Sequence, residues 1–456
     1  MEQYDAIIIG AGQGGSPLSH RLADLGWKVA LVEREFLGGT CINWGCTPTK
    51  TLIASAQAAH DARRASELGV HVGEVRVDFA EVMARQHRVV QQFREGQEAR
   101  ASSRPRLHLI RGEARFVGPH ELEVNGERLH SDRIFIDTGV HARLPDIEGR
   151  DEVEILTSKS ILGLNDLPAH LLILGGSYIG LEFGQMFRRF GSEVTIVEHN
   201  PRIISREDEE FSQTLQQILE GEGIRFLTGT DAQAARQEPD GTLRLTVKSK
   251  EGAEEILTGT HLLSAIGQTP NTAALNLEAA GVETDEQGYV LVNDRLETNV
   301  PGIWAIGDVK GGPAFTHLSY NDHQIIYENL VNGGNATKKG RIVPYALFTD
   351  PQLGRVGLTE RQAREEGYSV KVGSIPMSNV ARAIERGDTR GLMKVVVDAD
   401  TDKLLGASIL AAEGGELVQA LRVLMLADAP WTLLKGEVFI HPTLAEGFYA
   451  LFDSVK

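Results

Sequence analysis

The pattern of apolar and polar positions predicts a strand, a glycine-rich turn, a helix and a second strand at the start of the chain. An apolar run over 4–9 leads into a G-x-G-x-x-G turn that begins at Gly10, and residues 16–25 have helical periodicity. A second apolar run, 28–32, ends on Glu33, which lies 23 residues after the first glycine. This order and spacing are typical of a βαβ unit that binds a dinucleotide.

The same order of elements recurs in the middle of the chain. An apolar run over 171–174 enters a second glycine-rich turn that begins at Gly175, a helix-like segment continues to Arg189, and the run 193–197 ends on Glu198. The acid again lies 23 residues after the first glycine. A single glycine fingerprint is weak, but two complete copies in the same context predict two Rossmann-like dinucleotide-binding domains.

The pattern predicts further elements between and after these copies. They are a long charged helix over 79–101 and strands over 119–125, 257–267 and 302–308. From about residue 341 the pattern changes to that of an α+β domain without a fingerprint of its own. Its expected elements are a strand at 343–348, a helix at 360–366, strands at 393–398 and 404–410, and a helix at 416–426. We therefore expect an α/β protein with two Rossmann-like domains and a C-terminal α+β domain.

Length, charge and hydropathy narrow the class of protein. A chain of 456 residues accommodates about two to four domains, and its 41% hydrophobic and 24% charged residues are ordinary for a globular protein. The net charge of −17 provides no sizeable basic face, so we expect no nucleic-acid partner. The first residues are acidic where a signal peptide is basic, and no apolar run approaches the ~20 residues of a membrane span. We expect a cytoplasmic protein with no membrane partner.

Both cysteines of the chain, Cys41 and Cys46, lie in one glycine-flanked run, 38–50. A structural bridge across so short a loop adds little to a large core, and no second Cys or His cluster follows to complete a zinc site. In the cytoplasm a lone cysteine pair is more often catalytic than structural. The pair therefore predicts a dithiol that is oxidised to a disulfide and reduced again in turnover. A thiolate near a flavin and near a helix start has a lowered pKa, which suits thiol–disulfide exchange.

The fingerprints indicate which dinucleotides bind. In each copy the glycines bring backbone amides to a pyrophosphate at a helix start, and the acid accepts hydrogen bonds from a ribose. Ser177 replaces the second glycine of the later copy, which loosens the fit there slightly. Glu198 opposes a 2′-phosphate, so we expect NADH to be preferred, with NADPH as the alternative. Two dinucleotides indicate a relay in which a nicotinamide reduces a flavin and the flavin reduces the disulfide.

Near the end of the chain, His441 and Glu446 can form a proton-handling pair. A carboxylate at this distance can orient and charge the imidazole. The pair alone is a weak signal in a chain with 14 histidines. Its interpretation as a general acid–base is strengthened by the predicted redox dithiol, which needs one.

Taken together, these motifs resemble the class I pyridine nucleotide-disulfide oxidoreductases, a family that includes dihydrolipoamide dehydrogenase, glutathione reductase and mercuric reductase. The resemblance covers nearly the whole chain. It implies FAD at the first fingerprint, NAD(P)H at the second, and a homodimer with an active site shared across subunits. It also implies an FAD-binding domain over 1–150 and 272–340, an NAD(P)-binding domain over 151–271 and a dimerisation domain over 341–456.

The resemblance also implies roles for individual residues. Cys46 is expected to face the flavin, and Cys41 is expected to attack the substrate. Lys50 is expected to lie near the flavin ring and to pair with Glu182. Tyr178 is expected to cover the flavin where the nicotinamide enters.

The His441 and Glu446 pair matches the family's acid–base dyad, which acts on the dithiol of the other subunit. Asp308 is expected to meet the ribityl chain of FAD. The full set of expected cofactor contacts is Gly10, Gly12, Gly15, Glu33, Gly39, Thr40, Lys50, Ala114, Thr138, Gly139, Asp308, Thr316, Gly175, Ser177, Ile179, Gly180, Glu198 and Gly267. No resident metal is expected.

Residues 10–17 and 41–50 are similar to a mercuric reductase-like branch, which also includes a reactive-chlorine-resistance flavoprotein. Mercuric reductases carry a vicinal cysteine pair at the C-terminus and lack the His/Glu dyad, whereas residues 449–456 contain no cysteine and the dyad is present. We therefore do not expect mercury reduction to be the main activity. Trp44, inside the cysteine loop, is bulkier than the residue expected there, and either limits access to Cys41 or packs.

Three functions remain open. The leading one is an FAD-dependent NAD(P)H:disulfide oxidoreductase similar to dihydrolipoamide dehydrogenase, in which electrons pass from NADH through FAD to the Cys41–Cys46 disulfide and on to a small or protein-bound disulfide, or in reverse. The second is an NAD(P)H-dependent reductase of Cu(II) or Hg(II), because thiolates bind soft metals well. The third is a non-catalytic flavin redox sensor.

Overall fold

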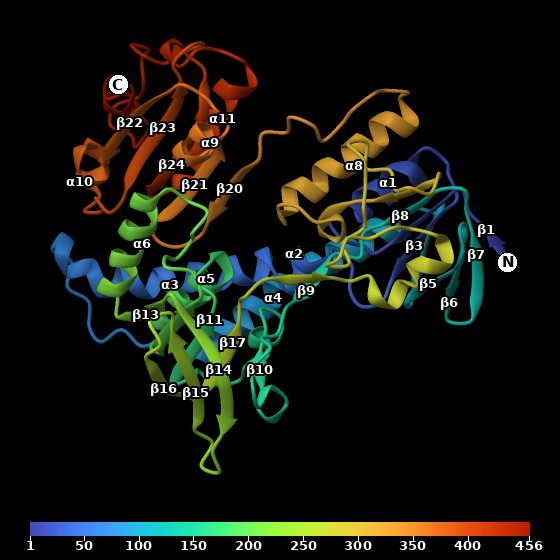
Figure 1. Cartoon of the computed structure of the whole chain (residues 1–456), viewed down its shortest axis with the longest axis horizontal. Coiled ribbons are helices and arrows are strands. Elements are labelled where there is room, and N and C mark those ends of the chain that lie inside the picture. Colours follow the sequence, from blue (N-terminus) through green and yellow to red (C-terminus); the bar gives the residue numbers. More distant parts are fainter. The chain divides into compact units, whose positions relative to one another are not determined.

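The computed structural model describes all residues, 1–456, and the chain divides into two compact units (Figure 1). The first unit consists of Met1–Thr51, Met83–Arg143 and Gly267–Arg341. The second consists of Leu52–Val82, Leu144–Ile266 and Ile342–Lys456. Each unit contains one glycine fingerprint. No helix has the length and apolar composition that a membrane crossing requires.

A five-stranded parallel sheet lies at the centre of the first unit, in the order β19-β8-β2-β3-β4. The strands are β2 (Ala6–Ile9), β3 (Val29–Glu33), β4 (Leu107–Arg111), β8 (Ile134–Ile136) and β19 (Ile303–Ala305). Helices α1 (Gly15–Asp24) and α8 (Thr316–Val331) pack on one face. The unit also contains the short helices α2 (Gly39–Asn43) and α7 (Leu277–Ala280) and the paired strands β9 (Val140–Ala142) and β18 (Gln268–Pro270).

Alternating residues of β2 face two different clusters, as a strand period of two requires. Ile8 packs with Leu18 and Ile325 of the helical layer. Ile7 and Ile9 belong to the opposite cluster, which a smaller sheet covers. That sheet has the order β1-β7-β6-β5, with β1 (Glu2–Gln3), β5 (Ala114–Gly118), β6 (Glu121–Val124) and β7 (Glu127–His130). Burial on both faces explains the continuous apolar run that the sequence shows at this strand.

The second unit is built on another five-stranded parallel sheet, in the order β10-β17-β11-β12-β13. Its strands are β10 (Ile155–Leu156), β11 (His170–Leu174), β12 (Glu193–Glu198), β13 (Ile224–Thr228) and β17 (His261–Ser264). Helices α5 (Tyr178–Phe190) and α6 (Glu209–Gly221) follow β11 and β12. An antiparallel sheet of β14 (Thr230–Gln237), β15 (Leu243–Ser249) and β16 (Glu254–Gly259) shares a core cluster with it.

The single strand predicted over 257–267 is wrong. The chain forms two strands there, because β16 pairs antiparallel with β15 and β17 pairs parallel with β10 and β11. The two lie in different sheets, and the amide of the intervening Thr260 donates to the carbonyl of His170. The pattern of apolar residues alone cannot distinguish one buried strand from two that lie in different sheets.

The C-terminal part of the second unit is an antiparallel sheet with helices, as predicted. The sheet has the order β20-β21-β24-β23-β22. Its elements are β20 (Pro344–Leu347), β21 (Gln352–Gly357), α9 (Glu360–Glu365), β22 (Val370–Pro376), α10 (Ala381–Glu385), β23 (Leu392–Asp398), β24 (Leu404–Ala411), α11 (Gly414–Leu426) and α12 (Phe448–Asp453). Strands β21 and β22 are not among the predicted elements. Glycine and charged residues interrupt their apolar alternation.

Two long helices contribute residues to both units. They are α3 (Cys46–Arg64) and α4 (Phe79–Ser102), the second of which matches the helix predicted over 79–101. With two parallel sheets that each carry a fingerprint, and a third antiparallel sheet, the structure confirms the predicted α/β class with two Rossmann-like domains and a C-terminal α+β domain.

Candidate functional site

The turn of the first fingerprint depends on close backbone approaches. Gly10 has a φ of +100°, and a Cβ on it would overlap the carbonyl oxygen of Asp137. A Cβ on Gly15 would overlap the carbonyl oxygen of Gly10. Glu33 closes the turn, since its Oε2 accepts a hydrogen bond of 2.9 Å from the amide of Ala11. The carboxylate of Glu33 therefore lies beside the amino end of α1, where it can accept hydrogen bonds from ribose hydroxyls.

The segment that carries the cysteines begins directly against this turn. The amide of Gly38 donates to the carbonyl of Ala11 at 2.8 Å, and a Cβ on Gly39 would lie 2.7 Å from the Cα of Gly12. Thr138 Oγ1, just after β8, is buried without a hydrogen-bond partner. A turn of glycines without side chains lets a dinucleotide approach the main chain closely, and the Thr138 hydroxyl is free to bond to it. The residues therefore fit the predicted FAD.

Cys41 lies in α2, and Cys46 is the first residue of α3. Both are thiols, and Cys46 Sγ lies 3.2 Å from Thr316 Oγ1 at the start of α8. The interaction with Cys46 and burial raise the pKa of Cys41, while Thr316 and the charge of Lys50 act in the opposite direction. The lowered pKa predicted for a thiolate beside a flavin stays a prediction. A negative charge on one thiol opposes ionisation of the other.

Asp308, a predicted FAD contact, lies in the same electrostatic environment as the dithiol. Burial raises its pKa to about 6; Lys310 opposes the shift, and the charges of Asp322 and Cys46 add to it. The structure thus brings together the first fingerprint, the dithiol and Asp308 within one unit. Lys50, in the first turn of α3, lies close enough to affect the Cys41 thiol.

Trp44 packs beside the dithiol segment rather than standing alone. Its ring meets that of Phe36 with centroids 6.0 Å apart. The guanidinium of Arg94, on α4, lies 3.7 Å from the centroid of Phe36 and 5.4 Å from that of Trp44. Arg94 Nε also donates to Asn43 Oδ1 at 2.6 Å. Of the two roles left open by the sequence, packing has direct support.

The second fingerprint repeats the backbone geometry of the first. Gly175 has a φ of +105°, and a Cβ on it would overlap the carbonyl oxygen of Ala265. A Cβ on Gly180 would overlap the carbonyl oxygen of Gly175. Glu198 Oε2 accepts from the amide of Gly176 at 2.6 Å, and Oε1 accepts from the amide of Asn200 at 2.7 Å. The buried carboxylate is fixed beside the turn, and these residues fit the predicted NAD(P)H.

Side chains after the second fingerprint form a buried network. The hydroxyl of Tyr178, the first residue of α5, donates to Glu207 Oε1 at 3.3 Å, and that of Tyr345 donates to the same oxygen at 2.6 Å. Arg355 donates to Glu207 Oε2 at 3.0 Å. Burial and the charge of Glu207 raise the pKa of Tyr178 to about 12. Tyr178 therefore stays a neutral phenol near neutral pH, with its hydroxyl bonded to Glu207.

Glu182, one turn further along α5, is buried, and its Oε1 accepts from the amide of Phe348 at 2.9 Å. Lys50 belongs to the first unit and Glu182 to the second, so the predicted pairing of these two residues stays a prediction.

His441 and Glu446 form the predicted pair. His441 Nδ1 lies 3.0 and 2.9 Å from the two carboxylate oxygens of Glu446. The imidazole side chain is exposed, and the carboxylate is largely shielded. With Nδ1 held by a carboxylate, Nε2 is the atom that can exchange a proton with a substrate.

Some predicted cofactor contacts have no supporting geometry. The side chain of Ala114 is buried in the hydrophobic core of the first unit, so only its backbone is available to a cofactor. Gly139 and Gly267 have positive φ and open space around the Cβ position. The individual roles assigned to Thr40, Ile179 and these three residues stay predictions.

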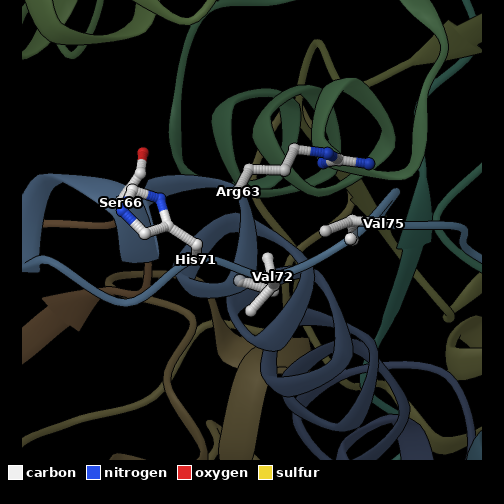
Figure 2. Close-up of a pocket in the computed structure, with 7 residues that line it drawn as sticks. Arg63, Ser66, His71, Val72 and Val75 are labelled. Carbon is white, nitrogen blue, oxygen red and sulfur yellow. The ribbon is translucent and has the colours of Figure 1, made fainter.

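A pocket lies at the end of α3, with Ser66 and His71 on one side and Arg63 and Val75 on the other (Figure 2). Its volume is about 260 Å³. It is lined by Ala62, Arg63, Ser66, His71, Val72, Gly73 and Val75. Arg63 already donates to the carbonyl of Arg189, and no predicted site residue lines the pocket.

Sequence reasoning missed two sets of residues near the fingerprints. Asp137 is buried against the first turn, and it had a signal, because an acid directly after a buried strand and before a Thr-Gly pair is unusual. Glu207, Tyr345 and Arg355 had none, because they are distant in sequence and meet only in the folded unit.

Known proteins match the chain along nearly its whole length. Residues 4–322 match the family model described as pyridine nucleotide-disulphide oxidoreductase, and residues 343–451 match the dimerisation domain of that family. The chain is 36% identical over 464 residues to the probable pyridine nucleotide-disulfide oxidoreductase RclA of Escherichia coli (strain K12), with 100% of both chains covered. It is 38% identical over 449 residues to dihydrolipoyl dehydrogenase of Thermus scotoductus, with 98% of this chain and 96% of the relative covered.

A solved structure agrees in fold. The Cu(II) complex of the HOCl-induced flavoprotein disulfide reductase RclA from Escherichia coli matches with a TM-score of 0.91 at 36% identity, and 100% of both chains is covered. The predicted oxidoreductase activity on disulfides and the cofactors FAD and NAD(P)H are confirmed by these relationships. The dimerisation domain supports a homodimer. The chain belongs to the pyridine nucleotide-disulfide oxidoreductase family.

Proposed function

We propose that the protein uses NADH to reduce a disulfide substrate through Cys41 and Cys46, with the His441–Glu446 pair of a second copy as the acid–base. The observation that carries the proposal is this pair, in which Glu446 holds Nδ1 with both carboxylate oxygens. A metal reductase has no need of an acid–base, whereas disulfide exchange releases thiolates that must be protonated.

Cys41 is the attacking thiol in this proposal. Because Cys46 raises the pKa of Cys41, a base is needed to form its thiolate. The Cys41 thiolate attacks one substrate sulfur, the substrate S–S bond breaks, and the leaving thiolate takes a proton from His441. Cys46 then attacks the Cys41 sulfur, which forms the Cys41–Cys46 disulfide and releases the second thiolate. FAD, when bound, relays two electrons from NADH to that disulfide.

Residues of the second fingerprint support NADH as the donor. Glu198 is buried, and its carboxylate is fixed by two backbone amides, so it cannot turn away from a 2′-phosphate. We assign the FAD-binding, NAD-binding and dimerisation domains to the boundaries predicted from the sequence. A cytoplasmic location stays a prediction.

The test is anaerobic NADH oxidation with lipoamide as the disulfide. Changing His441 to Ala should lower lipoamide turnover by at least about 100-fold, while flavin reduction by NADH stays unchanged. His87→Ala is the control, because that exposed histidine on α4 lies outside the site. Lipoamide turnover that survives His441→Ala would contradict the proposed role of the dyad.

Reduction of Cu(II) is the second candidate. It is favoured by the exposed soft thiol of Cys46 and by the Cu(II) complex solved for the RclA relative. One dithiol would reduce two Cu(II) ions to Cu(I) and become a disulfide. His441→Ala should leave this activity intact. Turnover of the unaltered protein with Cu(II) but not with lipoamide would establish metal reduction as the function.

A further inference from the structure

The two fingerprints differ at one buried position. The first glycine of each turn faces a backbone carbonyl, which belongs to Asp137 in the first copy and to Ala265 in the second. Both residues directly follow a strand of the parallel sheet, β8 and β17. They therefore occupy equivalent places, and only the first copy has a carboxyl group there.

The Asp137 carboxyl group lies inside the fingerprint. It is 6% exposed, and Oδ2 accepts a 2.7 Å hydrogen bond from the amide of Gly15, at the amino end of α1. A Cβ on Gly12, Gly15 or Gly307 would lie 2.7 to 2.8 Å from its carboxylate oxygens. The group thus sits beside the amides that a dinucleotide fingerprint offers to a pyrophosphate.

The charged groups around Asp137 are mainly acidic. Glu33 of β3, Asp308 of the turn after β19 and Asp322 of α8 lie close enough to oppose its ionisation. Lys310 and Arg341 of the same unit pair with Asp322, at 3.1 and 2.9 Å. Burial, joined by the three acids, raises the pKa of Asp137 well above its ordinary value, and the Gly15 amide offsets this only in part.

We propose that Asp137 makes FAD binding depend on a proton, with tight binding when its carboxyl group is neutral and weak binding when it is ionised. The inference rests on the proposed placement of FAD at the first fingerprint. An ionised Asp137 would place a negative charge beside the diphosphate, in a buried position where water screens poorly. Affinity is therefore highest below the pKa of Asp137 and falls as pH rises through it, and binding takes up a proton.

The test uses protein from which FAD has been removed. FAD is titrated back at about pH 5.5, 7 and 8.5 by flavin fluorescence, and proton uptake is measured by calorimetry in two buffers of different ionisation enthalpy. The affinity of the unaltered protein should fall by at least about tenfold across this range. Asp137→Asn keeps the size and an acceptor oxygen, and should vary by less than about threefold and take up no proton.

Two further variants complete the test. Asp137→Ala introduces the residue that stands at the equivalent place in the second copy, Ala265, and should also bind FAD independently of pH. Glu33→Gln should weaken FAD binding at every pH and keep the fall in affinity with rising pH, moved to lower pH because one of the acids that raise the pKa of Asp137 is lost. A flat profile in the unaltered protein, or an unchanged slope in both Asp137 variants, would overturn the inference and leave the FAD site standing. Unchanged FAD affinity in Glu33→Gln would contradict the proposed binding of FAD at the first fingerprint, and with it the inference about Asp137.

Discussion

The two dinucleotide fingerprints have the same backbone geometry but different side-chain surroundings. Gly10 and Gly175 have φ values of +100° and +105°. In both copies the acid after the second strand accepts from the amide of the second fingerprint residue, at 2.9 Å for Glu33 and 2.6 Å for Glu198. Backbone sterics and one carboxylate are thus enough to form the turn, and the neighbouring side chains determine its use.

The fourth residue of each turn illustrates the difference. In the first copy Gln13 donates to the carbonyl of Gly38 at 3.1 Å, which ties the turn to the dithiol segment. In the second copy the equivalent residue is Tyr178, whose hydroxyl donates to Glu207. One turn is therefore bonded to the segment that carries the two cysteines, and the other to a buried network at the start of α5.

The helices that follow the turns are also anchored differently. On α1, the guanidinium of Arg21 lies 3.3 Å from the ring centroid of Tyr327. On α5, Arg189 is buried and pairs with Glu222 and Asp350, each at 2.7 Å. The first anchor is a stacking contact, and the second is a buried ion-pair network that pH can weaken.

Substituting the last glycine of each turn should have the largest effect. Gly15→Ala should yield protein without bound FAD, because the new Cβ overlaps a carbonyl oxygen. Gly180→Ala should keep FAD but lower the rate of flavin reduction by NADH at least about 100-fold for the same reason. Flavin absorbance and stopped-flow reduction measure the two effects. Gly96→Ala, with open space around its Cβ position, is the control and should change neither. Loss of FAD in Gly180→Ala would contradict the assignment of the copies.

Asp350→Asn should destabilise the anchor of α5. Burial opposes ionisation of Asp350, but Arg390 and Arg189 lower its pKa to about 2, from 3.8. A carboxyl group whose pKa is lowered in the folded state stabilises the fold at pH values above its unfolded-state pKa, here by about 2 kcal/mol. This contribution is lost as pH falls from about 4 to about 2. Urea unfolding should show the difference at pH 7 and little of it at about pH 2.

The matched change in the other copy is Tyr327→Ala, which removes the stacking partner of Arg21. We expect a loss of about 1 kcal/mol at both pH values, because the contact involves no carboxyl group. An equal pH dependence of the two variants would show that the α5 anchor is not electrostatic.

Glu198→Gln should reduce the preference for NADH over NADPH by about tenfold, because the charge that repels a 2′-phosphate is removed. The measurement is kcat/KM for both nucleotides. Glu33→Gln should leave this ratio unchanged. A shifted ratio in Glu33→Gln would mean that the first fingerprint, not the second, selects the nicotinamide nucleotide.

The smallest effect is expected from Ser177→Gly, which gives the second turn the glycine of the first. Ser177 is exposed and its side chain makes no capping hydrogen bond to α5. The KM for NADH should fall by no more than about threefold, because only a minor steric obstacle is removed. A change of tenfold or more would assign the Ser177 side chain a direct part in binding.

Much of the site could be predicted because its signals are local. The glycines, Glu33, Glu198 and the cysteine pair stand at fixed spacings, and the structure places each beside its expected neighbours. Prediction failed where pairing with other segments decides the structure. Residues 257–267 were expected to form one strand, but β16 pairs with β15 and β17 pairs with β11, in different sheets.

Electrostatics were also beyond the reach of sequence reasoning. The raised pKa of Cys41 arises from the proximity of Cys46 and from burial, neither of which the spacing of the two residues reveals. The packing of Trp44 likewise depends on Arg94, which α4 brings from fifty residues along the chain.

The sequence by itself determined the family and the two cofactors, because backbone sterics at a dinucleotide turn allow few residues. The tertiary structure alone decided which charges meet. Asp137 lies among acids and Asp350 lies between arginines, so one carboxyl group has a raised pKa and the other a lowered pKa. The physical reason is that burial and neighbouring charges act through space, across segments that the order of residues leaves far apart.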